Sequence, residues 1–195
     1  MQYKQAHEIA IKKLKQLEPS CTRVNIAGSI AREKEFPKDI EICCTPHLVN
    51  NIDLFGAVLG DKKRMADFVR TVKSFGNIVS GDIEKGRYIK IDLHEGIRLD
   101  LFIPQENDYF RQYSIRVGSS EYSHKVLATA WRKLGWVGTP DGLRRIDECY
   151  SKEVSGKKHW ICNSIQPILP PVWESEYDFF KFLNLEWVEP HKRYV

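Results

Sequence analysis

Two acidic residues, Asp39 and Glu41, lie two positions apart in the stretch GSIAREKEFPKDIEICC, residues 28 to 44. Successive side chains of a β-strand point to opposite faces, so these two carboxylates share one face of an expected strand while their apolar neighbours face a core. Asp100, in the stretch IRLDLFI, repeats this pattern. If the two strands are neighbours, three carboxylates converge and repel one another, and a hard cation such as Mg²⁺, or Mn²⁺ in its place, relieves that repulsion. The pattern therefore predicts a divalent metal site.

A small-residue turn precedes these acids. Gly28 and Ser29 follow the expected strand TRVNIAG, and Arg32 comes four residues after Gly28. Free backbone N–H groups in such a turn bind phosphate, and a planar guanidinium adds charge-assisted hydrogen bonds to the same group. A phosphate cradle beside metal-binding carboxylates is the equipment of phosphoryl or nucleotidyl transfer. The alternative interpretation is that the acids form the solvated face of an amphipathic sheet.

The elements that must position these residues follow from hydrophobic periodicity. We expect an N-terminal amphipathic helix over residues 5 to 17, a polar loop after DIEICC, and a second helix around residues 65 to 72. The remaining expected elements are the strands NIVSG, RYIKIDL and IRLDLFI, helical segments from Asn107 to Leu134 interrupted at Gly118-Ser119, a strand HWICN, and an aromatic helix SEYDFFKFL. A composition shift near Pro104 to Asn107 indicates a domain boundary.

The composition bounds the function only weakly. The net charge of +4 is compatible with a nucleic-acid partner, but many proteins match it. The sequence contains no apolar run of the ~20 residues that span a bilayer, and its first residues are too polar for a secretory signal. The cysteines number five, an odd count without a C-x-x-C motif, which argues against a disulfide framework. We therefore expect reduced thiols and an intracellular protein, in cytoplasm or nucleoid, with a virus-encoded origin also considered.

Four ordered segments resemble the family X DNA polymerases, members of the polymerase beta-like nucleotidyltransferase superfamily. GSIAREKEFPKDIEI is similar to the family's Gly-Ser, arginine and Asp-x-Asp signature, and RLDLFIP resembles the strand with its third aspartate. RVGSSEYSHKVLATAWRKLGW resembles the Gly-Ser pair that opens a helix beside the incoming nucleotide. FLNLEWVEPHKRYV is similar to the closing segment of the C-terminal subdomain, so the likeness runs from about residue 20 to the end.

The resemblance implies an α+β fold with a palm domain over residues 1–105, built on a mixed or antiparallel sheet with flanking helices. A small α+β thumb subdomain over residues 106–195 would select the nucleotide. By the same likeness, Asp39, Glu41 and Asp100 would be the catalytic residues and would bind two Mg²⁺ ions. Asp100 would also receive the proton of the primer hydroxyl. The other implied sites are nucleotide-binding residues Gly28, Ser29, Arg32, Gly118, Ser119 and Ser123, and DNA-binding residues Arg98, Arg116 and Lys125.

This sequence departs from the family pattern at several positions. Glu41 stands where the polymerases usually have Asp, and the extra methylene bears on metal preference and rate. Ile115 and Arg116 replace an aromatic pair before the second Gly-Ser, which bears on sugar selection. Ser123 stands where the family has a nucleotide-contacting Asn. The sequence also leaves no room for an N-terminal lyase domain or for helix-hairpin-helix DNA clamps, so the expected plan is a palm and a thumb alone.

The sequence thus predicts a DNA-directed DNA polymerase of family X that adds deoxynucleotides to a primer 3′-hydroxyl, in gap-filling DNA repair. Its expected partners are deoxynucleoside triphosphates and primer-template or gapped DNA, with no membrane, and the expected state is a monomer. A template-independent nucleotidyltransferase, or one acting on RNA or a small molecule, remains an alternative. A non-catalytic nucleic-acid-binding module is the third.

Overall fold

The computed structural model describes residues 1–154 and 156–195, and for Asp61, Val154, Lys157 and Lys158 it describes the backbone alone. The chain divides into two compact units, Met1–Pro104 and Gln105–Val195. Both units combine helices with β-strands, so the α+β class expected from the sequence is confirmed.

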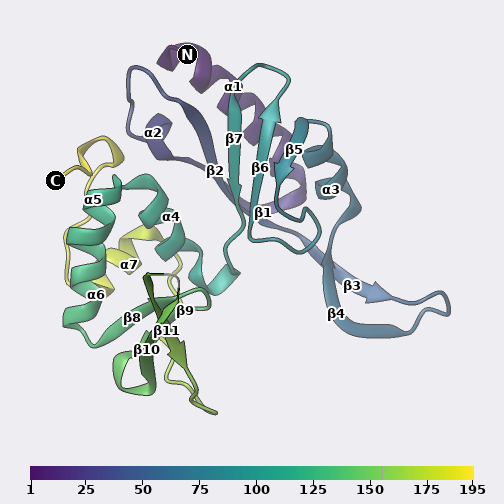
Figure 1. Cartoon of the computed structure of the whole chain (residues 1–195). Coiled ribbons are helices and arrows are strands. Elements are labelled where there is room, and N and C mark those ends of the chain that lie inside the picture. The colour runs from purple at the N-terminus through teal and green to yellow at the C-terminus, as the bar shows by residue number, and fades with distance from the viewer. Residues whose placement is uncertain (155) are drawn as a thin grey trace. The chain divides into compact units, whose positions relative to one another are not determined.

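Unit 1 contains three α-helices and seven strands among its described residues (Figure 1). In chain order they are α1 (Tyr3–Leu17), β1 (Cys21–Ala27), α2 (Gly28–Ala31), β2 (Asp39–Pro46), β3 (Leu48–Ile52), β4 (Val58–Arg64), α3 (Ala66–Lys73), β5 (Gly76–Ser80), β6 (Tyr88–Leu93) and β7 (Arg98–Phe102). Helix α1 gives way to a 3₁₀ turn at Glu18–Ser20, because Pro19 lacks the N–H group that would continue the helix.

A five-stranded mixed sheet forms the centre of unit 1, with the strand order β1-β2-β7-β6-β5. Strands β2 and β7 run parallel, whereas the other neighbouring pairs run antiparallel. The parallel pair places Ile40 opposite Leu99 and Ile42 opposite Leu101. Because side chains alternate along a strand, these four residues share one face of the sheet and the polar residues between them share the other.

The apolar face of the sheet is covered by α1 and α3 (Figure 1). Ala6, Ala10 and Leu17 of α1 are fully buried there, as are Phe68 and Val72 of α3. Their spacing of four or seven positions places them on one stripe of each helix. Both expected helices are therefore confirmed, and with one face closed by helices the polar face of the sheet carries the acidic residues.

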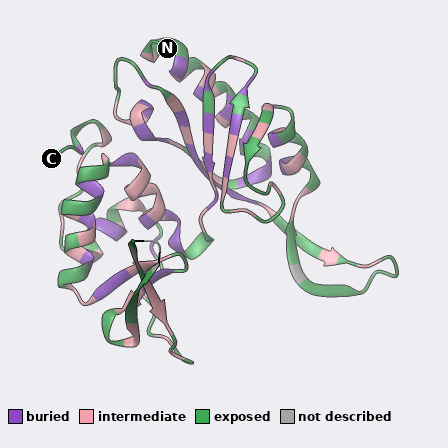
Figure 2. Ribbon diagram, viewed as in Figure 1, coloured by how far each residue is buried: buried purple, intermediate pink, exposed green. Residues whose placement is uncertain are grey.

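A two-stranded hairpin occupies the segment where the sequence predicted a polar loop. Strands β3 and β4 pair antiparallel, from Leu48 opposite Arg64 to Ile52 opposite Val58, and extend away from the central sheet (Figure 1). The loop prediction is wrong because LVNNI and VLGDKKR do not alternate between apolar and polar residues, so these strands lack the usual pattern. Most of the hairpin is exposed (Figure 2).

Unit 2 packs short helices against two small hairpins. Its helices are α4 (Tyr109–Val117), α5 (Ser120–Tyr122), the π-helical segment Ser123–Ala128, α6 (Thr129–Lys133) and α7 (Glu176–Phe182), with 3₁₀ turns at Glu106–Asp108, Ile146–Glu148 and Pro190–Lys192. Its strands are β8 (Trp136–Thr139), β9 (Gly142–Arg145), β10 (Cys149–Val154) and β11 (Lys157–Cys162). Trp131, Trp173, Phe179 and Phe180 contribute large buried side chains to its core.

A disulfide joins Cys149 of β10 to Cys162 of β11. The two residues face each other in the antiparallel register of this hairpin. The expectation of reduced thiols throughout is therefore wrong for this pair, because the hairpin brings together two cysteines that lie 13 positions apart. Cys21, Cys43 and Cys44 are reduced thiols and are buried in unit 1.

Within the two described stretches of chain, no helix combines the length and the apolar character that a membrane crossing requires.

Candidate functional site

The polar face of the unit 1 sheet carries all three predicted carboxylates. In the parallel pairing of β2 with β7, Glu41 lies opposite Asp100 and Asp39 lies opposite Arg98. Paired residues of neighbouring strands point to the same face, so Asp39, Glu41 and Asp100 are on one face. The first requirement of the predicted site, two adjacent strands with their acids in register, is met.

Asp39 lies in the electrostatic field of several neighbours. Partial burial raises the pKa of Asp39, and the negative charge of Asp100 raises it further, while Arg98 and Arg32 offset part of that effect. Asp39 also lines a surface pocket of about 590 Å³ together with Lys38, Asp92, Leu93, Gly96, Ile97 and Arg98. The Asp39 carboxylate thus faces a pocket and is repelled by Asp100, so it is suited to bind a cation from solvent.

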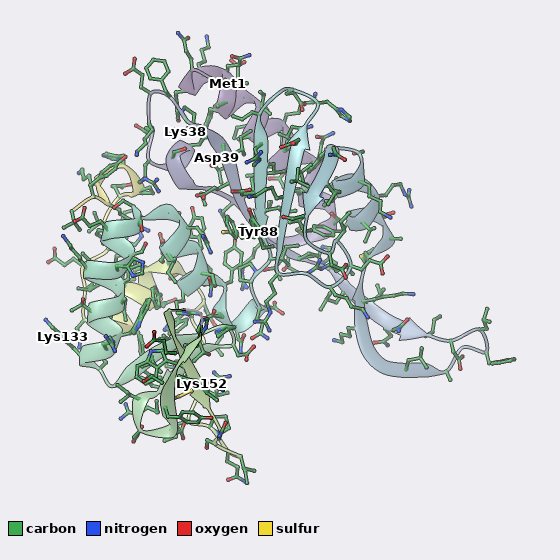
Figure 3. All side chains as sticks on the ribbon, in the orientation of Figure 1. Met1, Lys38, Asp39, Tyr88, Lys133 and Lys152 are labelled. Carbon is green, nitrogen blue, oxygen red and sulfur yellow. A yellow bond between two sulfur atoms is a disulfide. The ribbon has the colours of Figure 1, made fainter. Side chains whose placement is uncertain are left out.

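Asp100 is held by a hydrogen bond from Tyr88. The Tyr88 hydroxyl donates to Asp100 Oδ1 at 2.9 Å, and the Tyr88 ring stacks on Phe102 with 5.1 Å between centroids. Figure 3 labels Tyr88 at the beginning of β6 and Asp39 at the beginning of β2. Sequence analysis did not single out Tyr88, although its place in RYIKIDL gives it the same face as Lys90 and Asp92. The hydroxyl fixes one oxygen of Asp100 and leaves the other available.

Glu41 packs against the Gly28 turn. A Cβ placed on Gly28 would lie 2.7 Å from Cδ and 2.9 Å from Cγ of Glu41, closer than such atoms approach each other. Gly28 also has a φ of +64°, which favours glycine over residues with a side chain. Only glycine therefore lets the Glu41 carboxylate lie against the turn. This contact joins the strand that is expected to bind metal to the turn that is expected to bind phosphate.

Ser29 and Arg32 lie next to this carboxylate. The Ser29 hydroxyl is buried, and among the described residues it has no hydrogen-bond partner. A buried hydroxyl without a partner costs free energy, so a ligand oxygen at this position would be stabilised. The positive charge of Arg32 is near enough to Asp39 to lower the pKa of that carboxyl. The two residues thus present a donor and a positive charge beside the carboxylates.

The donor set suits a hard divalent cation, since carboxylate oxygens are the ligands that Mg²⁺ prefers. The side chains do not form a closed cage: in residues 1–154 and 156–195, no three His, Cys, Asp or Glu side chains gather closely enough to hold a metal ion. Asp39 and Asp100 are close enough to repel each other, whereas Glu41 lies against Gly28. The residues therefore fit a cation that is bound by two carboxylates and a substrate rather than enclosed by protein.

The predicted nucleotide-binding residues of unit 2 form a tight turn between two helices. Gly118 ends α4, and a Cβ placed on it would lie 2.9 Å from Cδ1 of Tyr122. Ser119 begins α5, where its hydroxyl accepts a hydrogen bond from the Tyr122 N–H at 3.1 Å. Ser123 is buried and its hydroxyl donates to the Ile115 carbonyl at 2.8 Å. The Gly118 N–H donates to the Ser114 carbonyl at 3.1 Å, and the Ser119 carbonyl accepts from the Ser123 N–H at 2.9 Å. The side chains and the backbone of this turn therefore both have structural partners.

The three predicted DNA-binding residues differ in their surroundings. Arg98 donates from Nε to Asp92 Oδ1 at 3.2 Å beside the carboxylates. Lys125 forms an exposed ion pair with Glu121, one helical turn away. Arg116 is half-buried near the end of α4. Arg98 therefore belongs to the candidate site of unit 1, and Arg116 and Lys125 belong to the helices of unit 2.

A buried ionic network supports the turn at Gly118-Ser119, and sequence analysis did not identify it. Arg193 is fully buried and donates to both carboxylate oxygens of Glu176, which also accepts from Ser114 at 2.8 Å and from the Trp187 indole at 3.0 Å. The carbonyl of Arg193 accepts from the Ser119 N–H at 3.1 Å. The C-terminal segment therefore fixes the backbone of the turn. No local sequence pattern pairs Arg193 with Glu176, which lie 17 positions apart in polar stretches of the sequence.

Comparison of the sequence with protein-family models gives no match, and comparison with curated proteins gives no significant match.

Proposed function

We propose that this protein is a DNA-directed DNA polymerase of the family X type, with unit 1 as its palm and unit 2 as its thumb. The observation that carries the proposal is the register of β2 and β7, which sets Glu41 opposite Asp100 and brings Asp39 within electrostatic reach of Asp100. The buried hydroxyl of Ser29 and the charge of Arg32 beside them supply the phosphate-binding groups that nucleotidyl transfer requires.

Asp39 and Asp100 would hold Mg²⁺ together with the substrate, with Mn²⁺ as a possible substitute, and Glu41 would add a third carboxylate once its side chain turned away from Gly28. When bound, these ions stabilise the charge of the triphosphate and lower the pKa of the attacking hydroxyl. The carboxylates are suited to this because their mutual repulsion is highest when no cation is present.

The side chains of unit 1 have distinct roles in the proposed reaction. The primer 3′-oxygen forms a bond to the α-phosphorus of the nucleotide while the bond from that phosphorus to pyrophosphate breaks. Asp100, oriented by Tyr88, accepts the proton that the 3′-hydroxyl loses. Ser29 and Arg32 hold the β- and γ-phosphates and stabilise the departing pyrophosphate.

Unit 2 would select the nucleotide. The backbone at Gly118 and Ser119 is fixed by α4, by Tyr122 and by the C-terminal carbonyl of Arg193. The missing side chain at Gly118 lets Tyr122 and Ser123 pack against the turn, which holds its backbone rigidly where we propose that the nucleotide lies. Arg98, Arg116 and Lys125 would contact primer or template DNA.

The proposal is tested by primer extension with Mg²⁺ or Mn²⁺ on single-stranded, primed and one-nucleotide-gapped DNA, with the four nucleotides offered singly. We expect addition of the complementary nucleotide, most efficient at the gap. The Asp100→Asn variant should lose at least about a hundredfold in rate, as removal of an acid–base group does, while Asp147→Asn, an exposed acid of unit 2, should behave as the wild type. Addition regardless of template would instead identify a terminal transferase. Nucleotide binding without addition to DNA would identify another acceptor or a non-catalytic module.

A further inference from the structure

The hairpin β3–β4, residues 48–64, carries an apolar tip that no other described part of unit 1 covers. Leu54 is 100% exposed and Phe55 is 96% exposed. Ile52, Val58 and Leu59 extend this apolar surface along both strands. Large apolar side chains that project from a domain on a narrow ribbon mark an interaction site. We call residues 48–64 the arm.

The tip of the arm is a turn that its own hydrogen bonds hold in place. The Asp53 carboxylate accepts hydrogen bonds from the N–H groups of Phe55 at 2.8 Å and of Ala57 at 2.9 Å. The Asp53 N–H also donates to the Ala57 carbonyl at 2.9 Å. The turn therefore satisfies the charge of Asp53 internally and holds Leu54 and Phe55 outward, as an apolar wedge.

The root of the arm is anchored to the body of unit 1. The Arg64 guanidinium donates to the carbonyls of Ile83 and Gly86, and lies 5.8 Å from the ring centroid of Phe68. The Met65 N–H closes the base of the hairpin by donating to the His47 carbonyl at 3.1 Å. These contacts give the arm a defined direction as it leaves the sheet (Figure 1).

We propose that the arm is a docking ribbon for duplex DNA, in which Leu54 and Phe55 enter the minor groove and Lys62 and Lys63 contact phosphates. This inference rests on the proposed function and adds to it a DNA contact outside the carboxylate site. Apolar wedges, phenylalanine and leucine among them, are inserted between base steps by proteins that bind the minor groove. Both lysines are exposed on β4 and complement the charge of the phosphates.

The spacing between the tip and the lysines sets how the arm must lie on DNA. Lys62 and Lys63 follow Val58 by four and five strand residues, which corresponds to roughly 13 to 17 Å. The minor groove is only about 7.5 Å deep, so the lysines meet phosphates when the arm lies along the duplex, which carries a charge about every 1.7 Å of its axis.

The size of the tip also argues against a second copy of this chain as the occupant. The apolar tip consists of five side chains, Ile52, Leu54, Phe55, Val58 and Leu59. A stable protein interface uses about 20–30 residues on each side. Asn50 and the two lysines interrupt the apolar surface towards the root of the arm.

The geometry of unit 1 sets the length of DNA that the arm needs. Asp39 begins β2 and the arm leaves the sheet after Pro46, which ends β2 about 23 Å away. For a duplex that runs along β2, at about 3.4 Å per base pair, the root of the arm lies roughly seven base pairs from Asp39. Its contribution should therefore vanish on a very short duplex.

The test measures binding by fluorescence anisotropy to two hairpin DNAs with the same recessed 3′ end and stems of about 6 and about 30 base pairs. The Leu54→Ser/Phe55→Ser variant should bind the long stem about tenfold more weakly and the short stem as the wild type does. In a plot of the logarithm of the binding constant for the long stem against the logarithm of salt concentration, Lys62→Ala/Lys63→Ala should make the slope shallower by about 1.8. Each lysine that neutralises a phosphate contributes about 0.9 to this slope. Ile165→Ser, a residue of unit 2 that is 97% exposed, is the matched control and should change neither affinity.

Equal binding of the long stem by the tip variant and the wild type would overturn the inference. Two further measurements would then identify another occupant. If the wild type sediments as a dimer and the tip variant does not, the occupant is a second copy of the chain. If the tip variant loses binding to vesicles of phosphatidylserine and phosphatidylcholine, the occupant is a membrane. DNA binding that depends on the tip, without nucleotide addition, would support DNA docking by the arm and contradict the polymerase proposal. Normal nucleotide addition, with DNA binding that does not depend on the tip, would support the polymerase proposal and contradict DNA docking by the arm.

Discussion

The Glu41 carboxylate lies against Gly28, with Cδ 2.7 Å from the position that a Cβ on Gly28 would take. A carboxylate of β2 and the backbone of the turn before α2 are thereby packed as one unit. Any side chain at position 28 displaces Glu41, so the turn and the acidic strand depend on each other.

We predict that Gly28→Ala destabilises the fold by about 1–2 kcal/mol through its strained positive φ, plus a smaller cost because the Glu41 side chain must shift out of the space that the new Cβ takes. Gly96→Ala is the matched control, because Gly96 has a φ of +76° and its Cβ would meet nothing within 4 Å. It should cost only the first contribution. Urea unfolding measures both, and equal losses would show that Glu41 does not fill the space beside Gly28.

The raised pKa of Asp39 makes stability depend on pH. Burial and the charge of Asp100 disfavour its ionised form in the folded state. The contribution of Asp39 to stability is therefore fully present below the ordinary Asp pKa of about 3.9 and is lost as the pH rises through the higher folded value.

Asp39→Asn should consequently be more stable than the wild type at pH 7 without divalent ions, and the difference should shrink on acidification to about pH 3, below the ordinary Asp pKa. Urea unfolding at both pH values measures this, with Asp147→Asn as the control. A difference that is independent of pH would contradict the assigned surroundings of Asp39.

The hydrogen bond from Tyr88 to Asp100 predicts an effect on rate. Tyr88→Phe keeps the ring on Phe102 and removes the donor, so Asp100 loses its fixed orientation. We expect a stability loss of about 1–2 kcal/mol, as for a hydrogen bond to a charged group. In the proposed reaction, kcat should fall about tenfold while KM for the nucleotide stays constant, since a loss limited to the reacting groups appears in kcat. Tyr177→Phe, at an exposed tyrosine of α7, should change neither quantity.

The buried pair Arg193–Glu176 predicts a large effect on unit 2. Arg193→Ala leaves the Glu176 carboxylate buried without its main cation, which typically costs about 3–5 kcal/mol. Lys125→Ala breaks the exposed pair with Glu121 and should cost no more than about 1 kcal/mol. Thermal unfolding compares the two variants. Similar melting temperatures would mean that the Arg193 network contributes little to the fold.

Periodicity was sufficient to predict the strands that carry the acids. Asp39 and Glu41 alternate with isoleucines, and Asp100 lies between leucines, so each strand shows its polar face. That β2 and β7 are direct neighbours was an assumption at the sequence level, because strand order depends on tertiary packing. The same alternation in RYIKIDL places Tyr88 on the acidic face. The sequence therefore contained the signal for this residue, although sequence analysis did not single it out.

Other features carried no local signal. The arm has apolar side chains on exposed surfaces, so it lacks the regular alternation of a half-buried strand, and Asn50, Asn51 and Asp53 give it the composition of a loop. The pairing of Cys149 with Cys162 follows from the register of a hairpin, which a count of cysteines does not contain. The contact between Ser119 and Arg193 joins residues 74 positions apart and depends on how the C-terminal segment packs.

The parallel pairing of β2 with β7 also sets the order in which the molecule can become competent. Asp100 follows Asp39 by 61 positions, and the intervening chain contains the arm, α3, β5 and β6. The chain must lose the entropy of closing a loop of this length before the contact between β2 and β7 stabilises it. Such long-range pairing therefore forms slowly compared with a local hairpin. A nascent chain that has emerged only as far as β6 holds Asp39 and Glu41 without their counterpart. The three carboxylates therefore come together only after nearly all of unit 1 has been synthesised.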